Sequence, residues 1–103
     1  MLNQLKRIFC RNRSYCDIEI DKLQLEKMQK QGAILLDVRS PQEFAEGHLK
    51  GAVLIPSYEI KKKAKQILKD KSKTIIVYCS SGYRSRKAQK ILKELGYEKV
   101  YNI

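Results

Sequence analysis

Short apolar runs that alternate with helical repeats are the feature that most limits how this chain can fold. The runs at 33–38, 52–56, 74–78 and 99–103 have the composition of buried strands. Strands separated by helices form a parallel sheet that the helices cover. A length of 103 residues with 43% apolar residues suffices for one such domain with a modest core.

Two helices are predicted from their start and stop signals. Asp21 can cap a helix that runs to about Lys30 and ends at Gly32. A second, short helix should span 40–47, because a serine, a first-turn proline and a glutamate three residues on form a capping box, with a glycine at the end. We expect Phe44 of this short helix to face the core.

Apolar residues recur at helical spacing in two further stretches, which predicts a helix over 58–69 and another that begins at Ser85 and is stopped by Gly96. The apolar positions are Ile60, Ala64, Ile67 and Leu68 in the first, and Ala88, Ile91, Leu92 and Leu95 in the second.

Positive charge is concentrated at two places in the chain. The formal net charge is +11, of which +4 lies in residues 1–14 and +6 in residues 61–73, so that only +1 belongs to the rest. The simplest interpretation of the lysines at 61–73 is a solvated helix face. Contact with nucleic acid is the weaker alternative, because no aromatic residues alternate with the lysines to stack on bases.

Residues 1–14 are interpreted as a basic, loosely ordered tail that precedes a domain over 15–103. The tail is too short and too charged for a membrane span and lacks the apolar region of a signal peptide. We therefore expect a cytoplasmic protein with no membrane span.

The three cysteines, Cys10, Cys16 and Cys79, argue against a disulfide framework, because their number is odd and no export signal is visible. Cys10 and Cys16 lack the close spacing of a zinc knuckle, and His48 is the only histidine. We expect no metal site and no cofactor, and we interpret His48 as a structural histidine.

Cys79 lies where the strand at 74–78 ends and a helix is about to begin. Ligands of parallel α/β sheets bind at this edge, and a helix N-terminus stabilises an anion and lowers the pKa of a thiol. The small residues after the cysteine let the backbone curl so that successive N–H groups converge on one point. The expected anion-binding loop consists of Ser80, Ser81, Gly82, Tyr83 and Arg84, with Ser85 in support.

The stretches "LLDVRSPQEFAEGHLKGAVLIP" and "IIVYCSSGYRSRKAQKILKELGY" resemble a single-domain rhodanese, a thiosulfate sulfurtransferase-like family, over residues 18–101. The resemblance implies a three-layer α/β fold whose parallel sheet has about five strands flanked by helices. It also implies that Cys79 takes sulfane sulfur from thiosulfate or a persulfide donor. The resulting Cys79 persulfide then passes sulfur to cyanide, a thiol or an acceptor protein.

Asp37 and Arg39 match the family's D-V-R motif, which lies near the active loop. They orient the loop backbone or line its entrance, or they form a structural ion pair; the sequence leaves these alternatives open. Glu43 is assigned mainly to helix capping.

Two other functions are possible on the same fold. Cell-cycle phosphatases and arsenate reductases place five residues between cysteine and arginine, whereas four separate Cys79 from Arg84, so the shorter loop fits sulfur better than phosphate. A sulfur-relay or binding module without thiosulfate turnover is the other alternative, with the lysine-rich helix as its docking face. The family pattern also includes a glycine-rich turn and a final helix after the last strand, which we expect this domain to lack.

Overall fold

The computed structural model describes residues 7–12 and 15–103, and the side-chain surroundings from residue 20 onward. The described residues form one six-stranded sheet in the order β1-β2-β6-β5-β3-β4. The strands are β1 (Arg7–Asn12), β2 (Tyr15–Glu19), β3 (Ile34–Asp37), β4 (Val53–Leu54), β5 (Thr74–Tyr78) and β6 (Lys99–Asn102). The helices are α1 (Lys22–Lys30), α2 (Pro41–Glu46), η1 (Ser57–Glu59), α3 (Ile60–Ile67) and α4 (Tyr83–Glu94).

Five of these strands run parallel, because β2, β6, β5, β3 and β4 pair with one another only in parallel. The predicted α/β fold with a parallel sheet flanked by helices is therefore confirmed. The register places Asp37 beside Tyr78 at the carboxyl ends of β3 and β5. This pairing brings the D-V-R motif next to the cysteine that follows β5.

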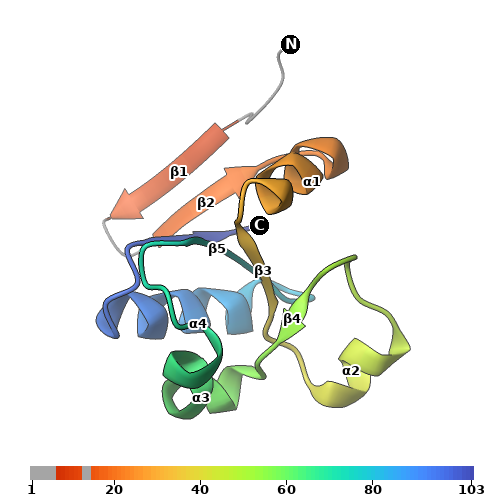
Figure 1. Ribbon diagram of the computed structural model, residues 1–103, viewed down its shortest axis with the longest axis vertical. Helices are drawn as coiled ribbons and strands as arrows, with labels where there is room; N and C mark the ends of the chain where they lie inside the picture. The colour runs from red at the N-terminus through yellow and green to blue at the C-terminus, as the bar shows by residue number, and fades with distance from the viewer. Residues whose placement is uncertain (1–6, 13–14) are drawn as a thin grey trace.

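Helices cover both faces of the sheet, as Figure 1 shows, with α1 on one side and α3 and α4 on the other. The larger core lies under α3 and α4, where Ile60 and Leu92 pack on strand residues such as Ile75. On the opposite face of the sheet, Leu25 of α1 packs on Leu35 and Ile76. Cys79 belongs to the α3 and α4 side.

Most of the predicted helix signals act as expected. The Asp21 side chain accepts a hydrogen bond from Gln24 N at 2.8 Å, and Ser40 and Glu43 form the complete capping box of α2. Two apolar positions were predicted wrongly. Ile67 is 44% exposed at the end of α3. Phe44 is half-buried and belongs to neither core cluster; its ring stacks on the exposed His48 at 3.7 Å between centroids.

Residues 1–14 were expected to form a loose tail, but within them β1 is an antiparallel strand at the edge of the sheet. It pairs with β2, with Ile8 opposite Ile18. The backbone N–H and C=O groups of β1 pair with the edge of the sheet at β2. This pairing does not depend on side-chain charge, so the basic composition of the segment does not prevent it. Residues 1–6 and 13–14 lie outside the described residues. No helix in the described ranges is long and apolar enough to span a membrane.

Candidate active site around Cys79

Cys79 follows β5 directly and is half-buried, so its side chain is packed against the core and still reaches the surface. Helix α4 begins at Tyr83, two residues earlier than the expected Ser85. Gly82 is its N-cap and has φ of 90°, a left-handed conformation that glycine adopts at little cost. The loop therefore contains only three residues between the thiol and the first turn of α4.

Backbone N–H groups of this short loop point at the sulfur. Cys79 Sγ accepts hydrogen bonds from Gly82 N at 3.0 Å and from Ser85 N at 3.4 Å. The Ser85 hydroxyl is also 3.4 Å from Sγ, and its Oγ lies 3.1 Å from the Gly82 carbonyl oxygen. The fully buried Ser85 is thus a direct partner of the sulfur rather than a residue at its margin.

Two opposing effects set the charge of this thiol. Burial raises the pKa of Cys79, but the hydrogen bonds from Ser85, Gly82 and Ser81 lower it more, so the net pKa lies below the ordinary thiol value. Hydrogen bonds to a thiolate stabilise the charged form. The arrangement can therefore hold a negative charge on sulfur.

The other loop hydroxyls contact the loop itself. Ser81 Oγ accepts a bond from Tyr83 N at 3.5 Å, and Ser80 Oγ accepts one from the Arg84 guanidinium at 3.2 Å. The Tyr83 side chain is exposed. The hydroxyls of Ser80 and Ser81 therefore shape the loop, while Gly82 and Ser85 make the hydrogen bonds with the sulfur.

Arg84 is held in place by a carboxylate from another element. Its guanidinium donates to both carboxylate oxygens of Glu43, at 2.7 and 3.0 Å. Together with the Ser40 backbone N–H, this pair lowers the pKa of Glu43 to about 2. The positive charge expected beside the cysteine is thus largely balanced by Glu43, which the sequence had assigned mainly to capping.

Asp37 and Arg39 form an ion pair behind the loop. Arg39 Nη2 is 2.8 Å from Asp37 Oδ2 and also donates to the Gly47 carbonyl at 2.6 Å. The Tyr78 hydroxyl donates to Asp37 Oδ2 at 2.7 Å and accepts from Leu49 N at 3.0 Å. Burial raises the pKa of Asp37, but the Arg39 and Tyr78 hydrogen bonds lower it more. Of the two alternatives, the structure contains the ion pair, and it anchors the 47–49 segment.

The exposed His48, which we interpret as a structural histidine, has a local partner for one of its ring nitrogens. Its Nδ1 lies 2.9 Å from the Phe44 carbonyl oxygen, to which an Nδ1–H would donate, and its ring stacks on Phe44. Among the described residues, no group of three His, Cys, Asp or Glu side chains is placed to hold a metal ion.

Sequence reasoning missed two roles in this region. Tyr78 ends an apolar strand, and nothing in its neighbours signals that its hydroxyl joins a carboxylate 41 positions away. The pairing of Glu43 with Arg84 spans the same separation along the chain and depends on how β3 and β5 lie side by side.

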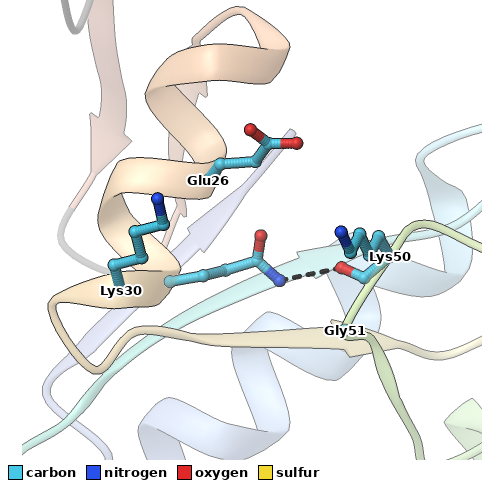
Figure 2. A pocket seen from close by; sticks show the side chains of 5 residues that line it. Glu26, Lys30, Lys50 and Gly51 are labelled. Carbon is cyan, nitrogen blue, oxygen red and sulfur yellow. Dashed lines mark hydrogen bonds between the residues drawn. The ribbon is translucent and has the colours of Figure 1, made fainter.

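A groove of about 350 Å³ lies elsewhere, between α1 and the segment before β4 (Figure 2). Gln29 Nε2 crosses it to the Lys50 carbonyl oxygen at 2.9 Å. Its other lining residues are Glu26, Lys30 and Gly51, which include no thiol. Because Cys79 packs on the opposite side of the sheet, this groove is not part of the cysteine site.

Comparison with known proteins agrees with the fold. The family model described as a rhodanese-like domain matches residues 21–103. The chain belongs to the rhodanese-like family. The match includes every element from α1 onward, and with it the Cys79 loop.

Several rhodanese-like relatives are sulfurtransferases by name. Thiosulfate sulfurtransferase PspE of Escherichia coli is 40% identical over 67 residues, which are 65% of this chain and 64% of PspE, just under two thirds of that relative. A sulfurtransferase of Allochromatium vinosum is 31% identical over 84% of this chain and 79% of its own length. The solved structure of a rhodanese with anions from E. coli has a TM-score of 0.66 at 38% identity, covering 69% of this chain and 84% of that one.

Proposed function

We propose that this rhodanese-like domain is a sulfurtransferase that carries sulfane sulfur on Cys79, with thiosulfate or a persulfide as donor and a thiol, cyanide or a protein as acceptor. The observation that supports this most directly is that Sγ accepts hydrogen bonds from the backbone N–H groups of Gly82 and Ser85, with the Ser85 hydroxyl 3.4 Å away. A structural cysteine needs no such donors, whereas a sulfur that becomes negatively charged in each step does.

The first step is attack of the Cys79 thiolate on the outer sulfur of thiosulfate. A new S–S bond forms on Sγ, the S–S bond of thiosulfate breaks, and sulfite leaves with the electron pair. The negative charge then resides on the terminal sulfur of the persulfide. The N–H groups at the start of α4 are fixed by the backbone, so they can stabilise this charge without rearrangement.

The second step returns Cys79 to its initial state. An acceptor thiolate, or cyanide, attacks the terminal sulfur of the persulfide, and the Cys79 thiolate is the leaving group. Because the hydrogen bonds that lower the pKa of Cys79 also make it a better leaving group, the same residues assist both steps. The Arg84–Glu43 pair fixes the loop from the α2 side.

The experiment is a mass measurement on the intact protein after mixing with thiosulfate. We expect a gain of one sulfur atom that maps to Cys79, and its loss on adding cyanide or a thiol. Cys79→Ser should gain nothing, while Cys10→Ser should behave as wild type. If wild type gains no sulfur but hydrolyses an aryl phosphate, the phosphatase alternative replaces this proposal.

A further inference from the structure

The start of η1 and the residues after β3 lie next to the Cys79 loop at one edge of the sheet. Ser57 N at the start of η1 donates to the Val38 carbonyl at 3.0 Å, and Val38 N donates to the Tyr78 carbonyl at 3.2 Å, one residue before the cysteine. Helices α3 and α4 contact each other, and η1 contacts α4. Because α3 follows η1 and α4 follows the loop, the first turns of both helices lie at the same edge of the sheet as Cys79 (Figure 1).

The exposed side chains of these segments include lysines that form no ion pair within the described residues. Lys61 and Lys62 on the first turn of α3 and Lys87 on α4 are exposed, and the ion pairs of the described residues do not include them. Glu59 in η1 is already paired with Lys63 at 3.2 Å, and Glu43, which reaches the start of α4, is paired with Arg84 at 2.7 Å. An approaching molecule therefore meets uncompensated lysines.

Two tyrosines add apolar surface to this edge of the sheet. Tyr58 in η1 is 73% exposed and Tyr83, the first residue of α4, is 74% exposed. Exposed tyrosines are frequent anchors of protein interfaces, because they bury a large area at little entropic cost. The rim, defined as Tyr58, Lys61, Lys62, Tyr83 and Lys87, thus combines anchors with charge.

We propose that the rim is the docking surface of a protein that exchanges sulfur with Cys79 and whose reactive cysteine is surrounded by acidic side chains. The inference depends on the proposed sulfur transfer, because a macromolecular acceptor must bring its own sulfur nucleophile, and a protein supplies a thiol whereas an ordinary nucleic acid or lipid does not. Charge complementarity then selects an acidic partner over a basic one.

Acidic neighbours also explain why such transfer is selective. They raise the pKa of the partner's thiol while it is free, which keeps it protonated and unreactive. On docking, the rim lysines offset these charges, and the thiol loses its proton to solvent. The thiolate attacks the terminal sulfur of the Cys79 persulfide, one S–S bond forms, the other breaks, and Cys79 leaves as thiolate.

The test uses synthetic peptides with one cysteine flanked by glutamates, by lysines or by serines. The second-order rate of sulfur transfer from persulfide-loaded protein is measured for each at low salt. We expect the glutamate peptide to react at least about tenfold faster than the lysine peptide, with the difference shrinking as salt is added. Equal rates, or a faster lysine peptide, would overturn the proposal.

Variants at the two ends of α3 supply a matched control. Lys61→Glu/Lys62→Glu should reverse the preference for the glutamate peptide. Lys69→Glu/Lys73→Glu makes the same charge change beyond the far end of α3, a helix of eight residues and about 12 Å, and should preserve the preference. Both variants should transfer sulfur to cyanide at the wild-type rate. Equal losses in the two variants would contradict a docking role for the rim.

Three further arms separate the remaining explanations. Tyr58→Ala should slow transfer to the glutamate peptide and not to cyanide, because Tyr58 is exposed in η1 and lies outside the Cys79 loop. Binding of duplex RNA or of phosphatidylserine vesicles that Lys61→Glu/Lys62→Glu abolishes, together with no peptide preference, would replace the protein partner by that ligand. Failure of Cys79 to take up sulfur from thiosulfate defeats the proposed function, whereas a loaded persulfide without peptide preference defeats only this inference.

Discussion

At the scale of single residues, the chemistry of this domain depends on which effect dominates at one sulfur atom. Burial raises the pKa of Cys79, and the donors from Ser85, Gly82 and Ser81 lower it further than burial raises it. Ser85 contributes twice to the lowered pKa of Cys79, through its backbone N–H and through its side chain, whose Oγ lies 3.4 Å from Sγ. It is therefore the residue whose side chain offers the cleanest test.

The pH dependence of Cys79 alkylation should have its midpoint below the ordinary thiol value of about 8.5. A lowered pKa means that the thiolate persists as the pH falls below that value and is lost only on passing through the folded-state pKa. Ser85→Ala removes the side-chain hydrogen bond that lowers the pKa of Cys79, so its midpoint should move up towards the ordinary value. Iodoacetamide rates on a Cys10→Ser/Cys16→Ser background measure both.

Ser81→Ala is the control for this profile, because the Ser81 hydroxyl accepts from Tyr83 N and does not contact the sulfur. Its midpoint should match wild type. A Ser85→Ala profile that coincides with wild type would remove the hydroxyl from the account of how the thiolate is stabilised.

At the scale of elements, the Cys79 loop is short because α4 starts early, at Tyr83. A helix that began at Ser85, as the sequence suggested, would leave Tyr83 and Arg84 in the loop. Gly82 in a left-handed conformation instead turns the chain into α4 at Tyr83 and points its own N–H at the sulfur. The start of α4 is thus set by the left-handed conformation of Gly82 more than by the helix propensity of the residues that follow.

Gly82→Ala should lower stability by about 1–2 kcal/mol, because a side chain disfavours the left-handed region. A Cβ at this position would meet no atom within 4 Å, so the cost is conformational and not steric. Persulfide formation should slow as well, since relief of the strain moves Gly82 N away from Sγ. Urea denaturation and single-turnover mass measurements give the two numbers.

Gly82→Asn separates conformation from other causes, because asparagine tolerates the left-handed region better than alanine does. It should recover part of both the stability and the rate. An alanine variant as stable and as fast as wild type would show that the positive φ is dispensable.

The elements themselves were largely predictable. The run at 74–78 is a strand with the predicted limits, and Ser40 with Glu43 formed the expected capping box, because these signals act between near neighbours. The run at 52–56 shortened to the two residues of β4, an edge strand with one partner. Ile67 was expected inside but lies at the last position of α3, where the helix ends and no element covers it.

At the scale of the whole molecule, a polar network connects the parts of the chain that surround the site. Asp37 of β3 is fully buried, and it is joined to Arg39, to Tyr78 of β5 and, through the Tyr78 hydroxyl, to Leu49 before β4. These contacts could not be read from the sequence, because the partners are far apart along the chain and no local pattern marks a tyrosine as a bridge.

Tyr78→Phe should lower the free energy of unfolding by about 1–3 kcal/mol, because it removes a donor to a buried carboxylate and the acceptor of Leu49 N. Tyr58→Phe, the same change at an exposed tyrosine, should stay within about 0.5 kcal/mol of wild type. Urea denaturation of both variants measures the difference. Equal stabilities would mean that the tyrosine hydroxyl is not part of what holds the 47–49 segment.

The sharing of Glu43 between two tasks has a consequence for how the protein behaves over time. One of its oxygens accepts from the Ser40 backbone and so completes the first turn of α2, while the same carboxylate neutralises Arg84. If that turn opens and Glu43 moves away, Arg84 loses its counterion and the local net charge beside Cys79 rises by one. The order of the six-residue helix α2 is thereby coupled to the electrostatic potential that an anion meets at the Cys79 loop.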